Sequence, residues 1–239
     1  ELELLVSQHD PAFIYKLSET FLAVPKRWLT DYYQVYKPYS IPFWCESRPE
    51  TLTEDNIRML AELNCARFSM GLENGNEDFR RTVLKRGYKN SVLVEGCKIL
   101  RKYNISFSCN LIIGFPFETR SIIWDGIKLL REIQPDGMSV FLFTPYSGTP
   151  LRKLCIDNNM VDSDIVCGDY FQDIYSLRNN GFTQDELVGL RRTIPLYVVL
   201  PEKMYPQIEK AEKLTDEGNA EFQKLRDIFY DIRGWNKNI

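Results

Sequence analysis

Short runs rich in β-branched and aromatic residues alternate with longer amphipathic stretches through residues 12–143. This alternation is typical of βα units, in which helices connect successive strands of a parallel sheet. The pattern predicts strands at residues 12–17, 41–46, 66–71, 106–114 and 137–143. We therefore expect an α/β fold built on a parallel sheet.

Residues that favour helix N-termini stand before three of the amphipathic stretches, at Thr53, Asn90 and Thr119. After Thr119, apolar residues recur at helical spacing, namely Ile123, Ile127, Leu130 and Ile133. Residues 1–8 read as the end of a helix that leads into the first predicted strand. Periodicity alone fits either an open doubly wound sheet or a barrel that has lost strands.

The pattern changes to helices and polar loops beyond about residue 150. Residues 207–232 are predicted to form an amphipathic helical pair with a break at Gly218-Asn219. We therefore divide the chain into a barrel-like part, residues 1–155, and a helical C-terminal extension, residues 156–239. Because a series of βα units that begins on a helix suggests truncation, we interpret the first part as a barrel without its first strand.

Composition excludes several classes of protein. The formal net charge is -3, so no basic excess indicates nucleic acid or an anionic membrane as a partner. No apolar run is long enough to span a bilayer and no signal peptide is recognisable, so we expect a cytoplasmic location. The six cysteines are too scattered for a metal knuckle or a disulfide framework, and most are expected to be small buried apolar residues. His9 is expected at the surface.

Polar side chains follow the predicted strands, where parallel βα folds place their ligand-binding groups. Carboxylates accept hydrogen bonds from ammonium groups and hydroxyls, and arginine binds carboxylates through two donors, so this set suits a zwitterionic or polyhydroxylated ligand. A hydrolase elbow and a phosphate-binding loop are both missing from the sequence. The set comprises Glu19, Glu46, Arg48, Glu73, Asn74, Asn110, Thr144 and Tyr146.

Four motifs occur in a fixed order, RPETLTEDNIRMLAELNCARFSMGLENGN, LKRGY, NLIIGFPFET and PDGMSVFLFTPYSGTPL. With these motifs, residues 12–155 resemble the radical S-adenosylmethionine (SAM) superfamily, and specifically the branch fused to cobalamin-binding domains. The resemblance implies a partial TIM-like (β/α)6 barrel that binds SAM across its strand ends. It also implies a [4Fe–4S] cluster, a small-molecule substrate, and cobalamin held by a domain outside these residues.

The resemblance also assigns roles to individual residues. Glu19 would meet the methionine ammonium, Arg86 the SAM carboxylate, and Glu73 the ribose or amino-acid part. Asn110 would contact the ribose, Gly114 would let the backbone approach the ligand, and the backbone at Phe143 and Thr144 would contact the adenine. Arg48 and Tyr146 are candidates for the substrate side. Gly114, Arg48 and Tyr146 are indicated by their positions at a turn or after a strand, and the other roles are what the resemblance implies.

The sequence also departs from the family pattern. The cluster motif C-x3-C-x2-C is absent from these 239 residues, so no cysteine is assigned to a metal. Lys16 and Ser18 stand where the family more often has an aromatic residue and an acid. Phe117 replaces the glycine of the usual GFPGET turn, and Ser147 replaces a common proline.

Three functional hypotheses follow. The leading one is a fragment of a radical SAM enzyme, completed by a missing N-terminal segment, that generates a 5′-deoxyadenosyl radical for methyl transfer or cyclisation; this chain alone would be catalytically incomplete. The second is a cluster-less barrel module with a binding or scaffold role. The third is an unrelated barrel enzyme that uses Glu19, Glu46 and Glu73.

Overall fold

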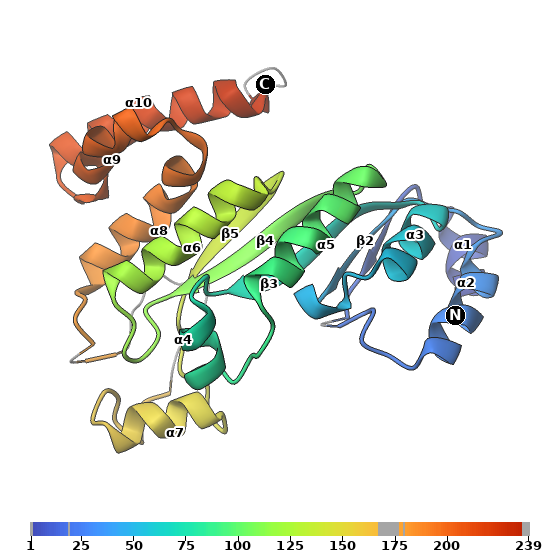
Figure 1. Ribbon diagram of the computed structural model, residues 1–239, viewed down its shortest axis with the longest axis horizontal. Coiled ribbons are helices and arrows are strands. Elements are labelled where there is room, and N and C mark those ends of the chain that lie inside the picture. The colour runs from blue at the N-terminus through green and yellow to red at the C-terminus, as the bar shows by residue number, and fades with distance from the viewer. Residues whose placement is uncertain (1, 19, 167–176, 179, 236–239) are drawn as a thin grey trace. The chain divides into compact units, whose positions relative to one another are not determined.

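The computed structural model describes residues 2–18, 20–166, 177–178 and 180–235 (Figure 1). Five strands form one sheet in the order β1-β2-β3-β4-β5, with β1, β2 and β3 paired in parallel. The predicted α/β fold with a parallel sheet is confirmed. The strands are β1 (Ile14–Lys16), β2 (Phe43–Ser47), β3 (Cys65–Glu73), β4 (Ser106–Ile113) and β5 (Gly137–Leu142).

Helices connect the strands and follow the last of them. Before β5 they are α1 (Leu2–His9), α2 (Lys26–Tyr36), α3 (Glu54–Glu62), α4 (Glu77–Thr82), α5 (Asn90–Lys102) and α6 (Arg120–Ile133). After β5 they are α7 (Pro150–Asp157), α8 (Gln184–Val199), α9 (Tyr205–Glu212) and α10 (Asp216–Arg233). Two short 3-10 helices are η1 (Pro49–Thr51) and η2 (Glu202–Met204). Among the described residues, no helix is both long enough and apolar enough to cross a membrane.

The chain forms two compact units. The first unit contains the residues up to 72 together with residues 87–110 and 135–139. The second unit contains residues 73–86, 111–134 and those from 140 onward, and therefore holds the ends of β4 and β5. The predicted division of the chain after residue 155 stays a prediction.

The core of the first unit forms where β2 and β3 meet the apolar faces of α3 and α5. Phe43, Phe68 and Leu100 are fully or almost fully buried there, as is Ile57 on the predicted face of α3. The Thr53 side chain accepts a hydrogen bond from the Asn56 N–H, which confirms the predicted start of α3. The predicted cap at Asn90 was wrong.

The start of α5 lies one residue earlier than the sequence indicated. Lys89 occupies the N-cap position with extended backbone and makes no side-chain cap, and Asn90 is the first helical residue. The helix is held instead by its buried face, which includes Leu93, Cys97 and Leu100. Burial of apolar surface therefore compensates for a weak helix terminus here.

The second unit is built on α6, whose predicted apolar face is buried as expected. The Thr119 side chain accepts from the Ile122 N–H and caps this helix. One guanidinium nitrogen of Arg131 donates to the carbonyl oxygens of Tyr197 and Leu200 at the end of α8. These bonds satisfy carbonyls that have no partner within a helix. Helices α9 and α10 pack against each other and against α8 (Figure 1).

The predicted break at Gly218-Asn219 was wrong, because Gly218 lies inside α10. The interruption lies between the end of α9 at Glu212 and the start of α10 at Asp216. The Thr215 side chain caps α10 by accepting from the Gly218 N–H. A Cβ atom on Gly218 would lie 2.0 Å from the Lys213 carbonyl oxygen. The glycine therefore permits a close approach of backbone and does not end the helix.

Candidate functional site

Strands β4 and β5 end side by side in the second unit. The Phe143 N–H donates to the Ile113 carbonyl oxygen at 2.8 Å, one residue beyond the end of β5. The rings of Phe115 and Phe143 pack with their centroids 5.0 Å apart, and Phe79 lies 6.1 Å from Phe115. Aromatic packing thus holds the two strand ends together.

Glu118 joins the turn after β4 to the end of β3. One of its carboxylate oxygens accepts from the backbone N–H groups of Gly114 and Phe115, at 2.5 and 3.2 Å. The other accepts from the Asn74 side-chain amide at 2.5 Å. The residue is 2% exposed, and this burial raises the pKa of Glu118 to about 8 in spite of the three hydrogen bonds, which act to lower it.

Glu73 and Arg86 form an ion pair at the end of β3. A guanidinium nitrogen of Arg86 lies 3.2 Å from a carboxylate oxygen of Glu73, and the two side chains are 37% and 17% exposed. Glu73 has a φ of 61°, in the left-handed region that ends the extended strand. Two residues that were predicted separately are therefore brought together, and both reach solvent.

A buried arginine holds the segment that carries this pair. Arg80 is fully buried and donates to the Asn74 carbonyl oxygen at 2.7 Å. Its own carbonyl accepts from the Arg86 N–H at 2.9 Å. Because Arg80 contacts both ends of the segment, it fixes the path of the backbone between Glu73 and Arg86.

The other predicted residues of the second unit surround the strand ends. Gly114 is buried and has a φ of 85°, in the left-handed region that glycine adopts without strain. Phe143 is buried and Thr144 half-buried directly after β5. Tyr146 lies two residues further and is 43% exposed.

Three predicted residues lie outside the described part of the second unit. Arg48 is exposed before η1 and Asn110 is half-buried in β4, and both belong to the first unit. Glu19 lies outside the described residues. The roles of all three stay predictions.

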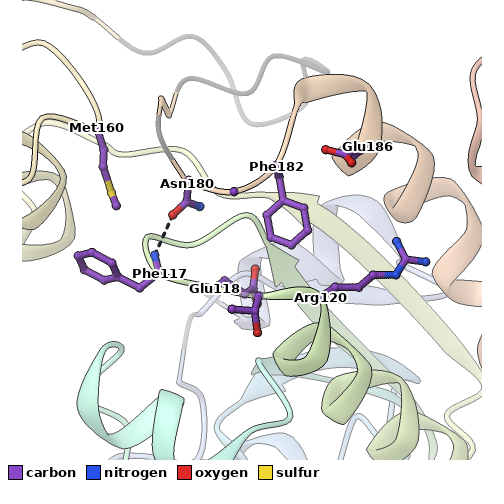
Figure 2. A pocket seen from close by; sticks show the side chains of 9 residues that line it. Phe117, Glu118, Arg120, Met160, Asn180, Phe182 and Glu186 are labelled. Carbon is purple, nitrogen blue, oxygen red and sulfur yellow. Dashed lines mark hydrogen bonds between the residues drawn. The ribbon is translucent and has the colours of Figure 1, made fainter.

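Asn180 is a buried residue that the sequence did not indicate. Its side-chain oxygen accepts from the Phe117 N–H at 2.8 Å (Figure 2), and its amide nitrogen donates to the Phe115 carbonyl at 2.7 Å. Asn180 and Glu118 therefore both fix the turn after β4 through hydrogen bonds to its backbone. Asn180 stands in a polar stretch more than sixty residues away, and no local pattern separates it from a surface loop.

Lys16, where the sequence departs from the family pattern, lies among aromatic rings in the first unit. Its ammonium nitrogen is 3.3 and 3.6 Å from the ring centroids of Phe43 and Tyr36, and it donates to the Tyr32 hydroxyl. Burial lowers the pKa of Lys16 to about 7. The ring faces attract the cation, but they do not replace the water it has lost.

We expect the substitution Lys16→Met to stabilise the protein at pH 7 by about 1–2 kcal/mol, a value reduced for partial solvent exposure. Between pH about 7 and 10.5 the unfolded chain binds the Lys16 proton more tightly than the folded protein, so stability rises with pH in this range. Urea unfolding of the wild type and of the variant at pH about 7 and 10 measures the difference in their free energies of unfolding. The exposed Lys26→Met is the control, and an equal gain from both substitutions would contradict the prediction.

Five cysteines are free and buried, namely Cys45, Cys65, Cys97, Cys109 and Cys155. The expected role as small apolar residues is confirmed for them, whereas Cys167 lies outside the described residues. In the part of the chain that the structure describes, no three His, Cys, Asp or Glu side chains are grouped to hold a metal ion.

Comparisons with known proteins extend these observations. The tRNA-2-methylthio-N(6)-dimethylallyladenosine synthase of Sulfurihydrogenibium sp. is 30% identical over 110 residues, which are 44% of this chain and 25% of the relative. The radical S-adenosylmethionine methyltransferase TsrM of Kitasatospora setae, solved with cobalamin and a [4Fe-4S] cluster, matches with a TM-score of 0.57 and 17% identity. That match covers 66% of this chain and 30% of TsrM.

The cobalamin-dependent S-adenosylmethionine radical enzyme OxsB has a TM-score of 0.56 at 12% identity, and the match covers 98% of this chain and 40% of OxsB. The chain thus spans less than half the length of each of these three proteins. At such identities the structures show a shared fold. The model of the radical SAM superfamily matches residues 4–130, more than half of the sequence. The chain therefore belongs to the radical SAM superfamily.

Proposed function

We propose that this chain binds SAM at the ends of β3, β4 and β5 and forms the SAM-binding part of a radical SAM enzyme. The observation that carries the proposal is the Glu73–Arg86 ion pair, which is partly exposed beside strand ends that Glu118 holds together. Membership in the superfamily and similarity to radical SAM methyltransferases support it.

The residues in place fit the amino-acid end of SAM. The Arg86 guanidinium would bind the carboxylate through two parallel donors, and the Glu73 carboxylate would accept from the ammonium or from ribose hydroxyls. The backbone at Phe143 and Thr144 would receive the adenine beside the glycine turn at Gly114. When bound, SAM supplies its methyl or 5′-deoxyadenosyl group to the reaction. Asn110 and Glu19 stay predicted contacts.

The described residues do not fit a [4Fe–4S] cluster, which needs cysteine thiolates that can reach one site. Burial raises the pKa of Cys97 to about 12 and raises that of Cys109 well above its usual range, so these thiols remain protonated. We therefore assign no cluster ligand here. Cobalamin dependence likewise stays a prediction, because it is inferred from the resemblance.

Titration of the purified chain with SAM in a calorimeter tests the proposal. We expect Arg86→Ala to weaken SAM binding about 10- to 100-fold, because a hydrogen-bonded charge contributes roughly 1.5–3 kcal/mol. Glu73→Gln should weaken it less, because the amide oxygen still accepts a hydrogen bond. Arg81→Ala is the matched control, since Arg81 pairs with Asp78 and both side chains of α4 are exposed.

The Glu73–Arg86 ion pair is partly exposed, so it contributes modestly to stability and thermal unfolding of the Arg86 variant should stay within a few degrees of the wild type. A loss of affinity with an unchanged unfolding temperature then reports binding and not folding. Wild-type protein that does not bind SAM, or full affinity in both variants, would contradict the proposal.

A further inference from the structure

A pocket of about 540 Å³ lies beside the turn after β4, entirely within the second unit (Figure 2). The turn itself forms one wall, and the segment that leads into α8 forms another. None of Glu73, Arg86, Phe143 or Thr144, the proposed SAM contacts, lines it. Its walls are formed by Phe117, Glu118, Thr119, Arg120, Met160, Asn180, Gly181, Phe182 and Glu186.

The charged and amide groups of the walls are already engaged by the protein. Arg120 donates to both carboxylate oxygens of Glu212, at 2.7 and 2.9 Å. Glu186 accepts from the backbone and hydroxyl of Thr183 in the capping box of α8. Glu118 and Asn180 bind the turn, as described above. These partners hold the polar side chains of the walls in place.

The apolar part of the walls is different. Phe117 is 46% exposed, and in Figure 2 its ring and that of Phe182 lie on either side of Asn180, with Met160 near Phe117. An exposed phenylalanine contributes little to folding through burial. The pocket thus presents aromatic and thioether surface, which favours contact with a planar ring.

The backbone at Phe117 has a conformation that favours glycine. Its φ is 66°, in the left-handed region where glycine is unstrained and a side chain is not. Among the described non-glycine residues with positive φ, Phe117 alone is apolar. The Asn180 side chain holds its N–H in place. A strained backbone therefore places the Phe117 ring at the wall of a pocket. Because Phe117 is 46% exposed, burial of the ring does not account for the strain.

We infer that this pocket binds an aromatic group of the substrate, with Phe117 as a specificity-determining residue. Phe117 would stack on the planar ring, and Phe182 and Met160 would cover its edges. That the ring comes from the substrate and not from SAM rests on the proposed function, which places adenine at Phe143 and Thr144.

The test uses two probes of matched size, N-acetylphenylalaninamide and N-acetylcyclohexylalaninamide, titrated into the whole chain and followed by NMR. We expect the aromatic probe to bind at least about fivefold more tightly than the saturated one. Phe117→Gly should weaken binding of the aromatic probe about fivefold or more while the unfolding temperature stays equal or rises, because glycine relieves the strain. Phe117→Leu keeps an apolar side chain and should lose the preference for the aromatic probe.

Equal binding of both probes, no binding of the aromatic probe at about 20 mM, or unchanged binding by Phe117→Gly would overturn the inference. Saturating SAM should leave the aromatic probe bound, and displacement by SAM would overturn the assignment to the substrate. Because the probe titration needs no SAM, failure of SAM binding alone would reject the proposed function and the assignment to the substrate, but not the binding of an aromatic ring at Phe117.

Discussion

Replacing Glu118 with alanine is expected to lower the free energy of unfolding by about 3–5 kcal/mol. The carboxyl oxygens accept hydrogen bonds from Asn74, Gly114 and Phe115, and each buried donor left without a partner costs roughly 1–3 kcal/mol. These bonds connect the ends of β3 and β4, so SAM affinity should fall together with stability. Urea unfolding with linear extrapolation measures the change.

The exposed Glu95→Ala is a suitable control, because its side chain is 65% exposed and contacts Lys98 on the same helix. It should change stability by less than about 0.5 kcal/mol. A Glu118→Ala protein within about 1 kcal/mol of the wild type would contradict the role given to this residue.

The same carboxyl group gives a pH dependence with a defined sign. Burial raises the pKa of Glu118 from 4.5 to about 8, so the folded protein holds this proton more tightly than the unfolded chain. The stability it contributes is fully present below pH about 4.5 and is lost as pH rises through about 8. Glu118→Gln cannot titrate, so the wild type should lose stability relative to this variant between pH about 5 and 8. A constant difference across that range would contradict the assignment.

The strands were predictable because each one is an apolar run bounded by turn residues, and burial of such runs decides their structure. Glu73 and Arg86 could be named from motifs, since each stands at a fixed place relative to a strand end. Their pairing could not, because it depends on Arg80, which folds the intervening segment back on itself. Sequence thus identified both members of the pair but not the contact that places them.

Glu118 and Asn180 show where sequence reasoning ended. Glu118 lies inside the recognised turn motif, yet acids at such positions are usually exposed helix-start residues. Here Glu118 is buried and accepts a hydrogen bond from Asn74, which is 44 positions away. Asn180 is held by the same turn across more than sixty positions. Tertiary partners at this separation leave no periodic signal, so a single sequence cannot reveal them.

Gly75→Ala is expected to be the second strongly destabilising substitution, with a loss of about 3 kcal/mol or more. A Cβ atom at this position would lie 2.4 Å from the Cα and nitrogen of Gly126, and 2.5 Å from the Asp125 carbonyl oxygen. All three atoms belong to the backbone of α6, which cannot move aside as a side chain would. The methyl group must therefore push apart α6 and the loop that follows Glu73.

The reciprocal substitution Gly126→Ala provides the matched control. Its Cβ would meet mainly the Leu111 side chain, at 3.2 Å, which can adjust. Alanine also favours a helix over glycine by up to about 1 kcal/mol, so this variant should stay close to the wild type. Because Gly75 lies two residues after Glu73, only Gly75→Ala should also weaken SAM binding. Equal stability of the two variants would show that the loop is free to move away from α6, and the position of Glu73 would then not depend on this contact.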